Sequence, residues 1–290
     1  MLTRAALLAI FLTTAASADD RSAMLVSSQW LAEHLHDPEL VLLHVGTPEN
    51  YAQHIPGARL VRVPDFALSS PGSTVELPPP DDLRARLEAI GISDNSRVVV
   101  VHAPDAVPVA TRFIFTLHAA GLGARASLLD GGLAAWQRAG NAVTADVPAA
   151  RTGHLSPLNM RSEIVDAEAV RTRAGAAGYA VIDARLPAFY SGAQVGGQKD
   201  TPHEAGHIPG AHSLPYTEML DAQQNVKSAD ALAEAFVKAG VRPGDKLTVY
   251  CHIGQQATTV IFAARTLGYD AVLYDGSFED WSRRGLPVER

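Results

Sequence analysis

The chain contains a single cysteine, Cys251, and the pattern around it favours a chemical role. The cysteine follows the apolar run Leu247–Tyr250, which has the length and composition of a strand covered on both faces of a sheet. From Ala257 onward the sequence has helical character. Ligands bind in α/β sheets where the strands end, so this order predicts a site at Cys251. The loop between strand and helix consists of His252, Ile253, Gly254, Gln255 and Gln256.

A loop that opens a helix can hold a cysteine as its thiolate. Backbone N–H groups at a helix N-terminus point towards one place and attract an anion. The thiolate is the nucleophilic form of cysteine, and Gly254 allows the backbone to turn tightly. The alternative is a small buried apolar cysteine, which is a common environment for a free thiol. The order of strand, cysteine, loop and helix favours a catalytic Cys251 whose loop binds the substrate.

Two sequence blocks occur twice and divide the chain into halves. The pentapeptide HIPGA occurs at 54–58 and 207–211, and a block that begins with Asp-Gly and ends in Trp occurs at 130–136 and 275–281. Two blocks in the same order indicate a duplicated domain, since solenoid repeats are only about 20–50 residues long. Pro and Gly residues interrupt the pattern between the halves. We therefore expect domains at 24–145 and 161–290.

Each half alternates apolar runs of strand length with amphipathic helical segments. The helical patterns at 81–90, 229–239 and 258–267 each stop before a glycine, as helices often do. This alternation predicts an α/β fold in which each half has a mainly parallel sheet flanked by helices. The expected strands are 40–45, 98–101 and 126–129 in the first half, and 179–183, 247–250 and 271–274 in the second.

The two halves together resemble a tandem-domain rhodanese, the family of thiosulfate and 3-mercaptopyruvate sulfurtransferases. The resemblance covers nearly the whole chain after residue 18. It rests on the repeated blocks, the Cys251 loop, and Asp183-Ala184-Arg185 with Tyr190. It implies two rhodanese-like domains, of which only the second is catalytic. Cys251 would take sulfane sulfur from a donor as a persulfide and pass it to a thiophilic acceptor. No cofactor and no metal site are expected.

The first half lacks the cysteine. Aligning 98–101 with 247–250 places His102 opposite Cys251. The loop after His102 contains Pro104 and Pro108, and proline has no N–H group to offer an anion. We expect an inactive first domain that helps to wall the cleft, because pockets favour domain interfaces.

The sulfur donor is less well specified than the nucleophile. The resemblance gives Arg185 a role in donor binding and Asp183 a supporting role, with a structural ion pair as the alternative for Asp183. Family members that use thiosulfate often carry a cation in the cysteine loop and an arginine before the aromatic residue, where this chain has Phe189. Members that use 3-mercaptopyruvate carry small loop residues, which are also missing here. Thiosulfate is placed ahead, with 3-mercaptopyruvate or a non-enzymatic persulfide carrier as alternatives.

An insertion distinguishes the second half from the first. Tyr190 and His207 are separated by 17 positions, against 3 for Tyr51 and His54. The sequence allows a loop that supplies charge beside the active site, or a tolerated surface insertion. The residues that suggest the first reading are Gly196, Gly197, Lys199 and His203.

Composition narrows the range of partners. The 290 residues carry a net charge of −7 without any cluster of Lys and Arg, which argues against nucleic acid and anionic membranes. We expect a small sulfur donor and an acceptor that is cyanide in vitro and a thiol in vivo, with a protein sulfur acceptor as a further candidate. A rhodanese-like phosphatase would need an arginine six positions after Cys251, where Ala257 stands.

Residues 1–18 have the pattern of a cleavable signal peptide. Arg4 precedes the apolar run 5–12, and Ala16-Ser17-Ala18 fits the rule for cleavage before Asp19. The run is too short to span a bilayer, which takes about 20 residues. We expect a periplasmic or secreted protein.

Overall fold

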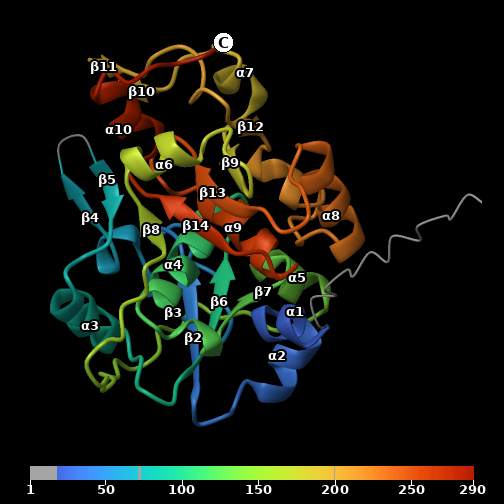
Figure 1. Cartoon of the computed structure of the whole chain (residues 1–290). Helices are drawn as coiled ribbons and strands as arrows, with labels where there is room; N and C mark the ends of the chain where they lie inside the picture. The colour runs from blue at the N-terminus through green and yellow to red at the C-terminus, as the bar shows by residue number, and fades with distance from the viewer. Residues whose placement is uncertain (1–17, 71–72, 199) are drawn as a thin grey trace, which may run out of the picture.

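A computed structural model describes residues 18–70, 73–198 and 200–290, and these contain two five-stranded sheets of the same design (Figure 1). The strand order is β1-β7-β6-β2-β3 in the first half and β12-β9-β13-β14-β8 in the second. Every pairing within these two sheets is parallel, which confirms the expected α/β fold with a parallel sheet in each half. The first sheet consists of β1 (Leu25–Val26), β2 (Leu40–Val45), β3 (Arg59–Val61), β6 (Arg97–His102) and β7 (Ala126–Leu129). The second consists of β8 (Ile164–Val165), β9 (Tyr179–Asp183), β12 (His212–Ser213), β13 (Lys246–Tyr250) and β14 (Ala271–Tyr274).

Helices connect the parallel strands, and several begin at side-chain caps. The hydroxyl of Ser228 accepts the N–H of Ala231 at 3.3 Å, and a carboxylate oxygen of Asp166 accepts that of Ala169 at 2.9 Å. The helices of the first half are α1 (Ala18–Met24), α2 (Ser28–His34), α3 (Pro80–Ala89), α4 (Val107–Ala119) and α5 (Gly132–Arg138). Those of the second are α6 (Ala167–Arg173), α7 (Pro187–Tyr190), α8 (Ala229–Lys238), α9 (Ala257–Arg265) and α10 (Ser277–Arg283). Short hairpins are formed by β4 (Leu68–Ser70) with β5 (Ser73–Glu76) and by β10 (Gly197–Gln198) with β11 (Thr201–Pro202).

The repeated HIPGA blocks have the same structural role in both halves. The ring of Tyr51 stacks on His54 at 3.8 Å between centroids, and Tyr190 stacks on His207 at 3.7 Å. Each histidine also exchanges two backbone hydrogen bonds with the segment that closes its own half. The repeated sequence therefore builds a repeated packing unit, in agreement with the expected duplication.

The two halves meet through α4 and α9, which lie against each other near the centre of Figure 1. The hydroxyl of Thr111 on α4 lies 3.0 Å from that of Thr258 and 3.1 Å from that of Thr259 on α9. A carboxylate oxygen of Asp130 in the first half accepts the N–H of Val226 in the second at 2.8 Å. These contacts place the helix that follows Cys251 directly against the first half.

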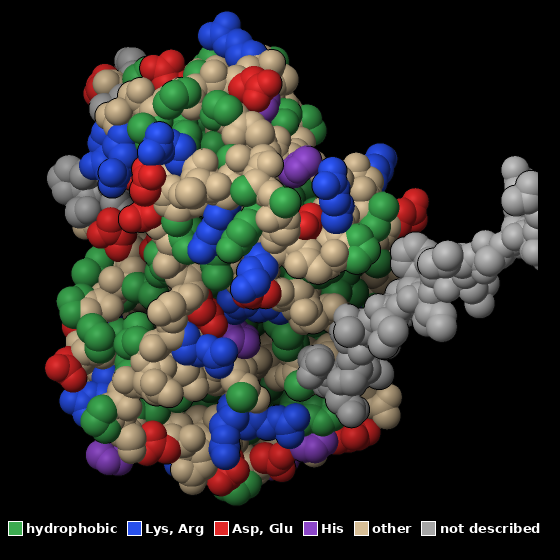
Figure 2. All heavy atoms as spheres, viewed as in Figure 1, with side chains coloured by type: hydrophobic (Ala, Val, Ile, Leu, Met, Phe, Trp, Pro, Cys, Tyr) green, Lys and Arg blue, Asp and Glu red, His purple; other side chains and the backbone are tan. Residues whose placement is uncertain are grey.

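The surface carries charges of both signs. On the face shown in Figure 2, Lys and Arg side chains are interspersed with Asp and Glu. Among the described residues, no helix combines the length and apolar character needed to cross a membrane.

Candidate active site

Cys251 lies directly after β13, at the carboxyl end of the central strand of the second sheet. Its side chain is fully buried. Its N–H donates to the hydroxyl of Ser277 at 3.3 Å, and its carbonyl accepts the N–H of Phe278 at 3.0 Å. Ser277 has a φ of +51°, a conformation that non-glycine residues rarely adopt, and Gly132 occupies the matching place of the first half. The second half has thus gained a hydroxyl where it meets the cysteine backbone.

The loop after Cys251 offers a row of unused N–H groups. Within the described part of the chain, the backbone N–H groups of residues 252–257 donate to no protein acceptor. The last of them begins α9, so the dipole of this helix adds positive potential at the same place. Such a row of N–H groups can bind an anion, and the role that the sequence predicts for this loop remains a prediction.

The carbonyl groups of the loop are held from outside. The carbonyls of Cys251 and His252 accept the N–H groups of Phe278 and Glu279, each at 3.0 Å. The carbonyl of Gly254 accepts Nη1 of Arg112 at 3.1 Å. Because a trans peptide group is planar, fixing its C=O in one direction fixes the N–H of the following residue in the opposite one. The anchors therefore orient the N–H groups that face away from them.

Any residue larger than glycine would be strained at position 254 of the loop. Its φ is +78°, and an added Cβ would lie 2.8 Å from both the carbonyl oxygen and Oδ1 of Asp275. Asp275 in turn forms an ion pair with Arg112, a residue of α4 in the first half. This geometry gives Asp275 a structural role, and the segment that it stabilises is the cysteine loop.

Asp183 and Arg185 form a buried ion pair beside the loop. Asp183 accepts Nε of Arg185 at 3.0 and 3.1 Å and Nη2 at 2.6 Å, and it also accepts the hydroxyl of Tyr250 at 2.8 Å. Burial acts to lower the pKa of Arg185, but the hydrogen bond and charge of Asp183 outweigh it and raise that pKa. The guanidinium also covers the ring of Phe278 at 3.8 Å. Nη1 of Arg185 makes no hydrogen bond within the described residues, and the role of Arg185 in donor binding remains a prediction.

The insertion of the second half packs onto the cysteine loop. The rings of His203 and His252 lie 5.6 Å apart, and Phe189 meets His252 edge-on at 4.6 Å. Burial, and secondarily the charge of Arg185, lowers the pKa of both histidines to about 4, so both are neutral at pH 7. Both ring nitrogens of His203 and Nδ1 of His252 are buried without a partner among the described residues. The insertion therefore lies beside the site and brings the neutral imidazole of His203 there, whereas Lys199 lies outside the described residues.

The first half places a histidine where the second has its cysteine. Leu43 pairs with Val100 in the first sheet, and Ile182 pairs with Val249 at the corresponding place of the second. His102 lies two residues after Val100, and Cys251 lies two residues after Val249, so the two residues occupy equivalent positions, as the sequence alignment predicted. Burial lowers the pKa of His102, and its Nδ1 lies 2.9 Å from the carbonyl of Ala103.

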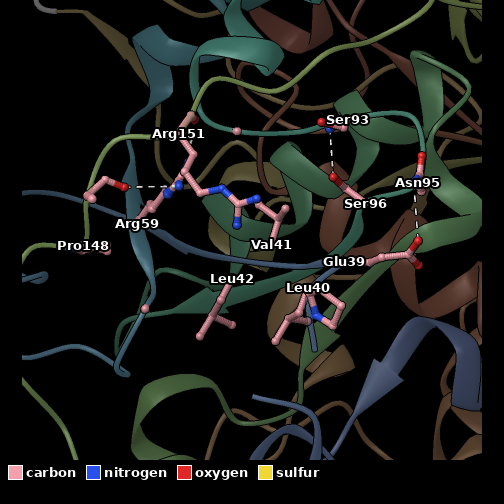
Figure 3. A pocket seen from close by; sticks show the side chains of 14 residues that line it. Glu39, Leu40, Val41, Leu42, Arg59, Ser93, Asn95, Ser96, Pro148 and Arg151 are labelled. Carbon is pink, nitrogen blue, oxygen red and sulfur yellow. Dashed lines mark hydrogen bonds between the residues drawn. The ribbon is translucent and has the colours of Figure 1, made fainter. Parts of the chain in front are cut away.

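One open pocket of the structure lies away from this chemistry. It encloses about 470 Å³ between β2 and the linker after the first half, and its polar lining includes Glu39, Arg59 and Arg151 (Figure 3). Arg59 is engaged by the carbonyls of Ile90 and Arg151 at 3.1 and 2.8 Å. None of the lining residues belongs to the cysteine loop.

In the described part of the chain, no cluster of three or more His, Cys, Asp or Glu side chains could hold a metal ion.

Sequence reasoning placed the candidate site at the cysteine and its loop, but it did not identify Arg112, Ser277 or the pairing of His203 with His252. One signal was present, since Arg112 stands inside the apolar segment 107–119. An arginine in such a segment is almost never buried without a partner. Its partner, however, is in the other half of the chain.

Comparisons with known proteins agree with this geometry. The family model for the rhodanese-like domain matches residues 27–139 and 166–284. The chain is 33% identical to a thiosulfate sulfurtransferase of Pseudomonas aeruginosa over 89% of this chain and 94% of the relative. It is 31% identical to a 3-mercaptopyruvate sulfurtransferase of Escherichia coli over 91% of this chain and 97% of the relative.

Two further comparisons bear on function and fold. A sulfur carrier protein of Thermus thermophilus is 28% identical over 92% of this chain and 96% of its own length. The crystal structure of a 3-mercaptopyruvate sulfurtransferase from Escherichia coli superposes with a TM-score of 0.76 at 26% identity, over 87% of this chain and 98% of that one. The chain is thus similar over most of its length to proteins with different named roles in sulfur transfer.

Proposed function

The chain belongs to the rhodanese-like domain family and is a sulfurtransferase, and we propose that it works through a persulfide on Cys251. The observation that carries this proposal is the row of N–H groups at 252–257, which directly follows a buried cysteine and has no acceptor among the described residues. A thiolate and a persulfide each carry one negative charge on sulfur, and such N–H groups stabilise both.

The proposed reaction has two steps. With thiosulfate, the Cys251 thiolate attacks the outer sulfur, the S–S bond of the donor breaks, and sulfite leaves with the bonding electron pair. The acceptor then attacks the terminal sulfur of the persulfide. Cyanide would leave as thiocyanate, a thiolate would become a persulfide, and Cys251 would return as thiolate. No external oxidant or reductant is needed.

Thiosulfate is the donor we place first, because it is a compact anion that needs little beyond the N–H row. The neighbouring cations do not distinguish the two donors, since Arg112 is paired with Asp275 and Arg185 with Asp183. Their carboxylates cancel most of the positive charge near the loop. 3-Mercaptopyruvate is the alternative donor, and relatives with either name match this chain to a similar degree. Arg185 is proposed to contact the donor only through Nη1.

A persulfide carrier is the second candidate function, because a relative covering most of the chain is named a sulfur carrier protein. A carrier would pass the sulfur to a protein thiol and turn over slowly with small acceptors. Thiocyanate formation from cyanide separates the two roles. The assay compares thiosulfate with 3-mercaptopyruvate and uses Cys251→Ser as the blank. Turnover that depends on Cys251 supports the enzyme, and loading of Cys251 without turnover supports the carrier.

Export is a separate proposal that rests on the sequence of residues 1–18 alone. Residues 1–17 lie outside the described part of the chain. Cleavage after Ala18 would leave Arg21, whose guanidinium donates to the carbonyls of Val226 and Lys227 at 3.1 and 2.8 Å. The mass of the N-terminal peptide, measured on protein recovered from the periplasm or the medium, tests this proposal. Uncleaved protein in the cytoplasm would contradict it.

A further inference from the structure

Arg112 is a fully buried arginine from the first half that reaches the cysteine loop of the second. Nη1 donates to the carbonyl of Gly254 at 3.1 Å and to Oδ1 of Asp275 at 2.5 Å. Nη2 donates to the carbonyl of Val75 at 2.5 Å and to Oδ2 of Asp275 at 3.3 Å. Burying a guanidinium is costly unless it is paired and hydrogen-bonded, and here one side chain joins three separate segments.

We propose that Arg112 is a positioning residue for sulfur transfer at Cys251. It fixes the peptide group between Gly254 and Gln255 by holding its carbonyl, so the N–H of Gln255 stays on the opposite side of the loop. That N–H belongs to the unpaired row at 252–257. The proposal rests on the proposed function, since it assigns Arg112 to the preparation of the site in which the Cys251 sulfur carries its charge.

The other anchors of the loop explain why this one matters. The carbonyls of Cys251 and His252 are held by α10, which belongs to the same half. The carbonyl of Gly254 is held by the first half. A loop that lacks this third anchor keeps its first turn but loses the fixed orientation of the Gln255 N–H. The half without a cysteine therefore supplies a part of the support of the reacting site.

A lysine could not perform the same task. The planar guanidinium reaches Gly254, Asp275 and Val75 at once, whereas an ammonium group is a single point of donation. Asp275 neutralises the charge of Arg112, so its contribution is orientation rather than attraction of the donor. A loss of orientation lowers kcat more than it raises KM, because stabilisation that acts in the transition state appears in kcat.

A purely structural clamp between the halves is the competing explanation, and the chain offers a matched control. Asp130 accepts the N–H of Val226 across the same interface at 2.8 Å, and its hydrogen bonds among the described residues do not involve the cysteine loop. Asp130→Ala therefore weakens the interface alone. Arg112→Met removes the hydrogen bond to the loop as well. Arg112→Lys keeps a positive charge near Asp275 but lacks the several N–H donors of the planar guanidinium.

The test makes three kinds of measurement on the full-length variants: the kinetics of thiocyanate formation (kcat and KM), the pH–rate profile of Cys251 alkylation by iodoacetamide, and the midpoint of thermal unfolding. Removing one oxyanion-hole donor costs about 10²–10³ in kcat, so we expect a loss of about tenfold or more from misplacing one N–H. Arg112→Met should show this loss with an alkylation profile moved to higher pH, because the thiolate is less stabilised. Arg112→Lys should fall between it and the unaltered protein, and Asp130→Ala should keep kcat and the profile.

A folded Arg112→Met variant with unchanged kcat and an unchanged alkylation profile would overturn the proposal. An equal loss of kcat in Asp130→Ala would also overturn it, because Arg112 would then act only as a structural clamp between the halves. If Arg112→Met does not fold, Arg112→Lys decides by the same criteria. If the unaltered protein transfers no sulfur, the proposed function fails by itself. The alkylation profile still tests the role of Arg112 in that case, because this measurement requires only the Cys251 thiol and no sulfur transfer.

Discussion

Asp183 and Arg185 form an ion pair with almost no exposed surface, at the strand end beside Cys251. Asp183 is the register partner of Tyr250, the residue before the cysteine, and accepts that residue's hydroxyl. Arg185 uses Nε and Nη2 on Asp183, and Nη2 also donates to the carbonyl of Gly206 at 2.8 Å. The pair thus joins three segments around the site, and most of the donor capacity of Arg185 is already used.

Arg185→Ala should destabilise the protein strongly, because it leaves the Asp183 carboxylate buried without its counter-ion. Breaking such a buried pair costs about 3–5 kcal/mol, which denaturant unfolding resolves. Arg171→Ala is the matched control, since Arg171 pairs with Glu168 on the surface and should change stability little. Unchanged stability with a raised donor KM would instead assign Arg185 mainly to donor binding, as the sequence suggested.

Gly254→Ala should impair sulfur transfer by displacing the loop. The substitution places a Cβ 2.8 Å from the carbonyl oxygen and Oδ1 of Asp275, in addition to the strain of a φ of +78°. Gly244→Ala is the control, because Gly244 has a φ of +86° with open space around the added atom. We expect a loss in kcat of about tenfold or more for Gly254→Ala, as for a displaced oxyanion-hole donor. Equal activity in both variants would show that the contact with Asp275 does not matter.

Buried histidines should make the protein less stable in mild acid. Burial lowers the pKa of His44, His118, His203 and His252 to about 4 from the usual 6.5. Between these values the unfolded chain binds protons that the folded protein does not, so stability falls as pH decreases from about 7 to 4. The slope is at most about 1.4 kcal/mol per pH unit for each such histidine.

Thermal unfolding midpoints measured between pH 7 and pH 4.5 check this expectation. His44→Leu should flatten the profile, because His44 has no exposed surface and lies outside the cysteine loop. A midpoint that stays constant over the whole window would contradict the assignment of these rings as neutral and buried.

The fold followed closely from periodicity. The predicted strands 40–45, 126–129, 179–183 and 271–274 have the bounds of β2, β7, β9 and β14, and the other two lie within β6 and β13. Continuous apolar runs are easy to place because both faces of a parallel strand are buried. The alignment of His102 with Cys251 succeeded for the same reason, since the register of one sheet repeats in the other.

The supports of the site could be predicted only in part. Cys251 and its loop were visible because a strand, a lone cysteine and a helix follow one another in the sequence. Arg112 and Asp275 are 163 positions apart, and only the packing of α4 on α9 brings them together. The insertion was expected either to supply charge or to be incidental. Burial keeps His203 neutral at pH 7, so this residue brings no charge to the site, and Lys199 lies outside the described residues.

The mass of the intact protein after treatment with a sulfur donor tests the central claim most directly. We predict an increase of about 32 Da, one sulfur atom on a covalent nucleophile, located on the peptide that contains Cys251. Addition of cyanide should remove this mass and release thiocyanate, and Cys251→Ser, folded as the unaltered protein, should gain nothing. An unchanged mass with the thiol shown to be free, or the same gain in Cys251→Ser, would contradict the persulfide at Cys251.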